Sequence, residues 1–119
     1  MGDMHLALGQ APVVLGDINK NLEIMEKLII SAKEECKNQL DLIAFPELFI
    51  TGYNLRDNYN KVAEVIPGPD KAQNGIKELA KKYNIHIATG IVEKKGKVLF
   101  NSAILVGPKG YIGHYRKQF

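Results

Sequence analysis

Two neighbouring apolar segments, residues 85–93 and 98–106, constrain the fold of this chain more than any other feature. Each carries apolar residues at consecutive positions, so each predicted strand is apolar on both faces. The residues between them, 94–97, include Gly96 and are typical of a hairpin turn that needs a positive φ angle. A sheet that is apolar on both faces must be covered on both. The pattern therefore predicts a layered fold, with helices against one face and a second sheet against the other.

The rest of the chain supplies the other elements of an α/β sheet. Short strands are predicted over residues 5–10, 42–45 and 111–116. Amphipathic helices are predicted over residues 18–36 and 70–83, because apolar residues recur there at intervals of three and four. The order is β-α-β, then a helix, then an antiparallel meander. This order indicates a layered α/β domain without internal repeats.

Polar residues mark the ends of the two predicted helices. Asp17 or Asn19 can cap the start of the first helix, and Asn84 is a suitable stop for the second. Residues 54–60 are polar and lack a regular period, so we expect an irregular loop there.

Composition and charge narrow the class of protein. The 119 residues are enough for one domain, and the hydrophobic fraction of 45% with 24% charged residues is typical of a globular protein. The net charge of +3 comes from basic residues spread along the chain, which favours a solvated surface over a nucleic-acid interface. No long apolar run or signal peptide occurs, so neither export nor membrane insertion is expected, and a cytoplasmic location is the default.

Cysteine and histidine usage gives no sign of a metal or cofactor. The single cysteine, Cys36, excludes an internal disulfide and a cysteine-based metal cluster. It falls at the end of the apolar stripe of the first predicted helix, so we expect it to be a packing residue. His5, His86 and His114 are scattered without the spacing of metal ligands. No metal site and no cofactor are therefore expected.

The stretch 45–53 contains the first candidate site residue, Glu47. Pro46 ends the hydrogen bonding of the preceding strand because it has no N–H. Glu47 therefore lies just past a strand end, where layered α/β folds commonly place site residues. Apolar residues flank it on both sides, so we expect a low-dielectric pocket that raises its pKa and makes it a better general base at neutral pH. The alternative is an exposed glutamate in a simple turn.

Two short motifs resemble the signatures of the nitrilase, or carbon–nitrogen hydrolase, superfamily. The first is Phe45-Pro46-Glu47-Leu48 followed by Thr51-Gly52-Tyr53, and the second is Tyr115-Arg116-Lys117. The order of elements also matches, so the resemblance extends from about residue 4 to the end of the chain. It implies a four-layer α-β-β-α sandwich, nitrilase-like and truncated here to its N-terminal part.

The resemblance also implies roles for individual residues. In the family a cysteine thiol attacks the amide or nitrile carbon, a glutamate takes its proton, and a lysine stabilises the charged intermediate. By position Glu47 matches the glutamate and Lys117 the lysine, and both are candidate catalytic residues. Tyr53 closes the first signature and is a candidate to line the substrate pocket. The alternatives are a surface lysine at 117 and a structural tyrosine at 53.

The nucleophile of this triad is missing from the sequence. In the family the cysteine lies in a third signature beyond the lysine, whereas Cys36 precedes Glu47. We therefore expect residues 1–119 to be the N-terminal portion of a single hydrolase domain, inactive alone. Its expected partners are a small amide or nitrile substrate, the missing C-terminal part of the same fold, and further copies of itself, with no nucleic acid and no membrane.

Two other interpretations remain open from the sequence. One is a non-catalytic half-domain that self-associates as an interaction module. The other is a small flavodoxin-like binding domain, which the antiparallel meander after residue 85 disfavours. Asn101 and Ser102 interrupt an apolar strand, and we expect them to be hydrogen-bonded core residues rather than site residues.

Overall fold

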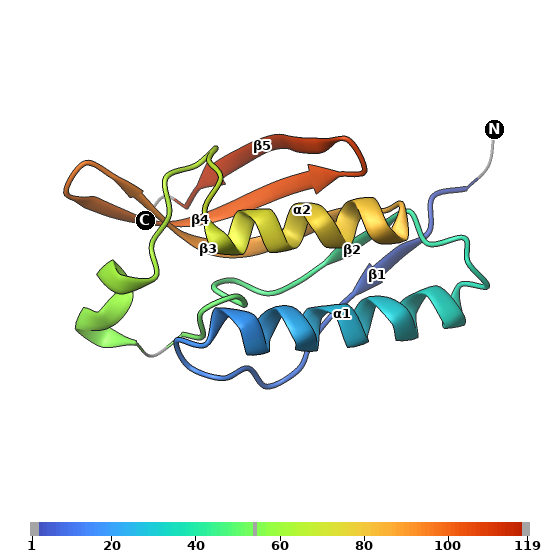
Figure 1. Cartoon of the computed structure of the whole chain (residues 1–119). Helices are drawn as coiled ribbons and strands as arrows, with labels where there is room; N and C mark the ends of the chain where they lie inside the picture. Colours follow the sequence, from blue (N-terminus) through green and yellow to red (C-terminus); the bar gives the residue numbers. More distant parts are fainter. Residues whose placement is uncertain (1–2, 54, 118–119) are drawn as a thin grey trace.

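The structure is a computed structural model that describes residues 3–53 and 55–117 (Figure 1). In chain order its elements are β1 (Leu6–Leu8), α1 (Ile18–Glu35), β2 (Leu42–Ala44), the 3₁₀ helix η1 (Arg56–Lys61), α2 (Lys71–Tyr83), β3 (His86–Lys95), β4 (Val98–Gly107) and β5 (Gly110–Arg116). The strands of the described chain form one sheet in the order β1-β2-β3-β4-β5. β1, β2 and β3 are parallel, and β3, β4 and β5 are antiparallel. The predicted mixed α/β sheet is confirmed.

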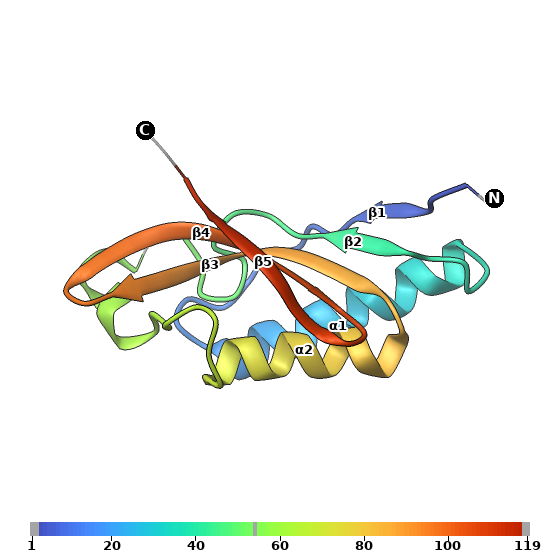
Figure 2. The same cartoon turned by 90° about the horizontal axis from the view of Figure 1, so that it is seen from above.

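The helices α1 and α2 lie on the same face of this sheet (Figure 2). Side chains from that face fill the core between the sheet and the helices, and Ile43, Ile87, Ile91 and Ile104 are almost completely buried there. The opposite face is open within the described residues, where no second sheet lies against it. The strand ladder places Leu6, Leu8, Ala103 and Tyr115 on this open face.

Helix α1 follows the predicted pattern closely. Asp17 caps its start, because the Asp17 carboxylate accepts a hydrogen bond from the backbone N–H of Lys20 at 3.0 Å. Met25 and Ile29 lie in the middle of the buried stripe. Cys36 ends the helix half-buried against the core, as its position in the stripe predicts.

The start of helix α2 is capped by Glu64, which lies several residues before the helix, and not by the residue that directly precedes it. Asp70 precedes the helix but makes no side-chain capping hydrogen bond. The buried carboxylate of Glu64 instead accepts from the backbone N–H groups of Ala72 at 2.6 Å and Gln73 at 3.1 Å. A negative charge there also interacts favourably with the positive end of the helix dipole. Asn84 ends α2 in the left-handed conformation, as predicted.

The expectation of an irregular loop over residues 54–60 was partly wrong. Residues Arg56–Lys61 form the 3₁₀ helix η1, and Asn54 lies outside the described residues. A short 3₁₀ helix satisfies its backbone locally and has no amphipathic period of 3.6, so periodicity does not reveal it. The first strand is also shorter than expected, with β1 limited to Leu6–Leu8. No helix formed by the described residues has the length and apolar character required to cross a membrane.

Candidate active site

Glu47 follows β2 in a turn that packs tightly against β3. The backbone N–H of Phe45 donates to the Ala88 carbonyl at 2.8 Å, and the N–H of Gly90 donates to the Pro46 carbonyl at 3.2 Å. The chain then turns at Leu48, whose φ of 52° lies in the left-handed region that non-glycine residues rarely adopt. This turn leaves Phe45 and Leu48 buried and Glu47 exposed.

Gly90 makes this close approach possible. A Cβ atom at Gly90 would lie 2.6 Å from both the Cα and the carbonyl carbon of Glu47. Real side chains do not tolerate such a contact with backbone, so any larger residue would push the turn away from β3. The absence of a side chain on β3 therefore fixes the position of the Glu47 backbone.

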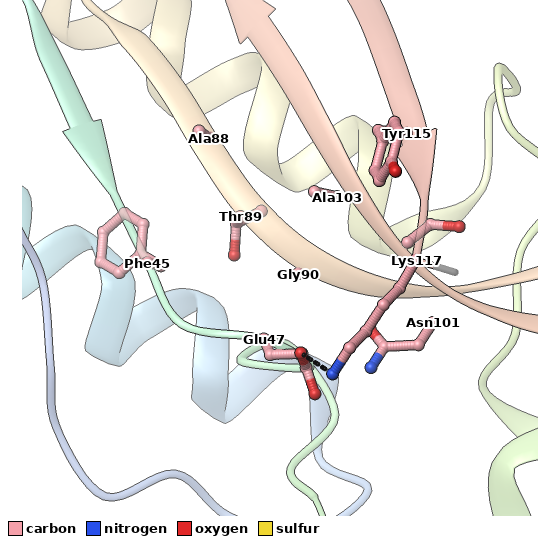
Figure 3. A pocket seen from close by; sticks show the side chains of 10 residues that line it. Phe45, Glu47, Ala88, Thr89, Gly90, Asn101, Ala103, Tyr115 and Lys117 are labelled. Atoms are coloured by element: carbon pink, nitrogen blue, oxygen red, sulfur yellow. Dashed lines mark hydrogen bonds and ion pairs between the residues drawn. The ribbon is translucent and has the colours of Figure 1, made fainter. Parts of the chain in front are cut away.

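Lys117 reaches Glu47 from the other end of the chain. Its backbone N–H donates to the Asn101 carbonyl at 2.8 Å, which continues the pairing of β5 with β4 by one residue. The Lys117 Nζ atom donates to the Glu47 Oε2 atom at 2.9 Å (Figure 3). Folding thus brings together two of the sequence-predicted site residues, which are 70 positions apart.

Tyr53 completes the surroundings of the carboxylate. Its hydroxyl donates to the Glu47 Oε1 atom at 2.6 Å. The Tyr59 hydroxyl in turn donates to the Tyr53 carbonyl, which connects η1 to the site. Tyr53 is itself exposed and lies outside the set of residues that line the neighbouring cavity. The three sequence-predicted site residues are therefore in contact, because Tyr53 and Lys117 both donate to the Glu47 carboxylate.

The electrostatics of Glu47 differ from the sequence-based expectation. The side chain is 34% exposed, so it does not sit in a low-dielectric pocket. Hydrogen bonds from Tyr53, Lys117 and Asn101 stabilise the anion and lower the pKa of Glu47 to about 2. The expectation of a raised pKa was wrong, because donors to the charged form outweigh desolvation. The same contacts with Glu47 raise the pKa of Tyr53 and the pKa of Lys117.

A cavity of about 260 Å³ opens beside the Glu47–Lys117 pair. Besides these two side chains it is lined by Phe45, Ala88, Thr89, Gly90, Asn101, Ser102, Ala103 and Tyr115. The lining is mainly apolar, and the charged pair lies at its edge (Figure 3). Such a cavity can hold a small molecule and present one polar group of it to a carboxylate and an ammonium.

Asn101 is a site residue that the sequence did not reveal. Its side chain lines the cavity and lowers the pKa of Glu47, contrary to the expectation of a core residue. Ser102 is buried and donates to Glu93 at 2.9 Å, so the expectation of a hydrogen-bonded core residue is confirmed for Ser102, which also borders the cavity. A polar residue in an otherwise apolar strand was the available signal, but it does not tell which face of the strand borders a cavity.

Cys36 lies outside this arrangement. It lines a different hollow, formed beside β1 and α1 by Leu6, Gly9, Ile43 and neighbouring residues. Glu47, Lys117 and Asn101 do not border that hollow. The structure therefore supplies a proton acceptor, a cation and a cavity at one place, with the chain's single thiol elsewhere.

Comparison with known proteins places this chain in a family. The sequence profile of the family described as carbon-nitrogen hydrolase matches residues 5–118. The nitrilase of Pyrococcus abyssi is 42% identical over 101 residues, which cover 83% of this chain and 37% of that protein. Probable nitrilase C965.09 of Schizosaccharomyces pombe is 32% identical over 117 residues, which cover 95% of this chain and 42% of that protein.

Solved structures share the fold. Nit3 of Saccharomyces cerevisiae, a member of branch 10 of the nitrilase superfamily, superimposes with a TM-score of 0.86 at 24% identity over 98% of this chain and 44% of that chain. XC1258 of Xanthomonas campestris, a CN-hydrolase superfamily protein, gives a TM-score of 0.81 at 24% identity over 100% of this chain and 42% of that chain. The chain thus spans well under half the length of these relatives. With a family profile matched over nearly its whole length, the chain belongs to the carbon–nitrogen hydrolase family.

Proposed function

We propose that this chain supplies the Glu–Lys half of an active site that hydrolyses the non-peptide carbon–nitrogen bond of an amide or nitrile. Glu47 is the general base, Lys117 stabilises negative charge, and Tyr53 donates a hydrogen bond to Glu47 and so tunes its basicity. A cysteine thiol from a segment that this chain does not contain is the nucleophile. One observation carries the proposal: the Lys117 ammonium contacts the Glu47 carboxylate at 2.9 Å, at the edge of a mainly apolar cavity.

The charge state of Glu47 suits a proton acceptor. With a pKa of about 2 it is ionised at neutral pH and can accept the proton of a thiol. Transfer from a free thiol, whose pKa is about 8.5, to so weak a base is unfavourable in the resting arrangement. If the Lys117 ammonium turns toward an oxyanion forming on the substrate, Glu47 loses one of its donors and becomes a stronger base. Lys117 thereby couples charge stabilisation to proton transfer.

The proposed reaction with an amide proceeds in two balanced steps. The thiol sulfur bonds to the carbonyl carbon, its proton passes through Glu47 to the leaving nitrogen, and ammonia or an amine departs from a thioester. Water then attacks the thioester with Glu47 as base, which releases the carboxylic acid and restores the thiol. The chain alone lacks the nucleophile at this site and is proposed to be inactive, and in a cytoplasmic setting the supplied thiol would stay reduced.

A chimera tests this function. This chain replaces the matching segment of the Pyrococcus abyssi nitrilase, and ammonia release from simple nitriles and amides is measured. We expect the chimera to be active, and Glu47→Gln or Lys117→Met to lower kcat by roughly 10²–10⁴-fold, the usual contribution of a general base or of a group that stabilises the developing charge. Glu26→Gln is the matched control, because it removes a carboxylate that also binds a lysine, Lys82, on the helical layer.

A folded chimera in which Glu47→Gln retains full activity would contradict the proposal. A folded but inactive chimera, beside an active parent nitrilase, would contradict it as well. Circular dichroism of each variant establishes folding before activity is compared.

A second candidate function is a self-associating interaction module without catalysis. The open sheet face favours it, because Leu8 on that face is 80% exposed. In that case Glu47→Gln would leave self-association unchanged, whereas substitutions on the open face would alter it. Glu47→Gln and a substitution on the open face therefore separate the two candidates, because the first tests catalysis and the second tests self-association.

A further inference from the structure

A buried carboxylate lies on the opposite face of the sheet from Glu47. The Glu93 side chain is 2% exposed and belongs to β3. It accepts hydrogen bonds from Arg116 Nε at 2.9 Å and Nη2 at 3.0 Å, and from the Ser102 hydroxyl at 2.9 Å. His114 Nε2 lies 3.3 Å from the same carboxylate. Strands β3, β4 and β5 are thus joined through one side chain.

The contacts of Glu93 hold it in its charged form. Burial raises its pKa, and the hydrogen bonds from Arg116 and Ser102 with the nearby His114 more than offset this, so the pKa of Glu93 is lowered overall. The hydrogen bond with Glu93 in turn raises the pKa of Arg116. A two-pronged contact between a guanidinium and a carboxylate fixes orientation as well as distance. Arg116 also lies over the Phe100 ring, 4.5 Å from its centroid, which further restricts its side chain.

The position of Arg116 bears directly on the candidate active site. Arg116 is the last residue of β5, and Lys117 follows it immediately. Successive residues of a strand point to opposite faces, so Arg116 is directed toward the helices and Lys117 toward the open face. Beyond β5, the backbone of Lys117 is tied to β4 by the hydrogen bond to the Asn101 carbonyl. Strand ends with few hydrogen bonds open readily unless side chains restrain them.

We propose that Glu93 is a positioning residue: by clamping Arg116 across β4, it holds the end of β5 so that the Lys117 ammonium stays against the Glu47 carboxylate. The catalytic meaning of this clamp rests on the proposed function, but the positioning itself does not. A merely structural ion pair would stabilise the sheet and leave the Glu47–Lys117 contact unchanged. The two roles therefore differ in what happens to Glu47 when Glu93 is neutralised.

The pKa of Glu47 reports the clamp without any activity assay. It is measured by NMR titration of the side-chain carboxyl carbon in the 119-residue chain. We expect Glu93→Gln to raise the Glu47 pKa by about one unit or more, a tenfold change in proton affinity, because the ammonium is no longer held in place. Arg116→Lys keeps the charge but loses the two-pronged contact, and we expect a smaller rise. Glu26→Gln, which breaks a carboxylate–lysine pair between α1 and α2, is expected to leave the Glu47 pKa unchanged.

A folded Glu93→Gln variant with an unchanged Glu47 pKa would overturn the proposal. If that variant does not fold, Ser102→Ala and Arg116→Lys decide by the same titration, and the proposal falls if neither raises the Glu47 pKa. In the active chimera, Glu93→Gln is expected to lower kcat with little change in KM. A shifted Glu47 pKa in a system without hydrolysis would leave the clamp standing and remove the proposed function, so the two failures are distinguishable.

Discussion

At the scale of single residues, the notable feature is a carboxylate held firmly as an anion. Tyr53 and Lys117 each donate to a different oxygen of Glu47, and the donor that lowers its pKa most is the Tyr53 hydroxyl. A strand-end glutamate with apolar neighbours would have a raised pKa if it were buried without donors. Here one donor, Tyr53, comes from the end of the same loop, and the other, Lys117, comes from the far end of the chain. The strength of Glu47 as a base is therefore set by groups that can move away from it.

Removing one of these donors should change the pKa of Glu47. We expect Tyr53→Phe to raise the pKa of Glu47 above its value of about 2, as measured by NMR titration. Because the folded pKa lies below the ordinary value of 4.5, ionised Glu47 contributes stability above that pH, and this is lost as pH falls toward 2. Tyr53→Phe should narrow the pH range over which this stability is lost, because the Glu47 pKa then lies closer to 4.5.

Tyr83→Phe provides the matched control for this titration. The Tyr83 hydroxyl donates to a Glu26 oxygen at 2.6 Å, the same kind and length of contact that Tyr53 makes with Glu47. Its loss should change the pKa of Glu26 and leave Glu47 unaffected. Equal pKa values for Glu47 in the parent and in Tyr53→Phe would show that Tyr53 does not govern the carboxylate.

At the scale of elements, the site depends on how closely the turn after β2 approaches β3. Gly90 is the one residue of β3 whose missing side chain leaves room for the Glu47 backbone. Leu48 adopts the left-handed region in this turn, a conformation that costs of order 1–3 kcal/mol for a residue with a side chain. Contacts elsewhere must hold the turn in place, and its packing against β3 does so.

Gly90→Ala tests this dependence on β3. A Cβ at that position would meet backbone rather than a flexible side chain. We expect the free energy of unfolding to fall by about 1–3 kcal/mol or more, since overpacking against backbone forces the chain to shift. Gly113→Ala is the control, because a Cβ there meets nothing within 4 Å. Chemical denaturation measures both, and a Gly90→Ala midpoint equal to that of Gly113→Ala would refute the close-packing account.

At the scale of the whole molecule, the sheet has one covered face and one open face (Figure 2). Leu6 and Leu8 are 56% and 80% exposed on the open face, and Tyr115 is exposed on it near the other edge. Apolar side chains gathered on one face of a protein commonly mark an association surface. The candidate active site opens on this same face, because Lys117 and Tyr115 share it.

We expect the isolated chain to self-associate through this open face. Light scattering of the purified chain should give a mass above that of a monomer, and Leu8→Lys should reduce it by placing a charge in the contact. Ile30→Lys is the control, because Ile30 is an exposed apolar residue of α1 on the other side of the sheet. A monodisperse monomer at high concentration would contradict this expectation.

The sequence alone determined what depends on local patterns. The period of α1 and α2, the stop at Asn84 and the end of β2 shortly before Pro46 all follow from residues close in the chain. The two short signatures also brought out Glu47, Tyr53 and Lys117 as residues to examine together.

Only the tertiary structure decided what these residues do to one another. The lowered pKa of Glu47, the place of Asn101 beside the cavity and the bond between Glu93 and Arg116 depend on strand register and on which face each side chain takes. The physical reason is that a charge responds to groups within a few ångströms in space. Here Arg116 lies 23 residues from Glu93 and Lys117 lies 70 residues from Glu47, and even Tyr53, six residues from Glu47, reaches it only through the fold of the loop between them.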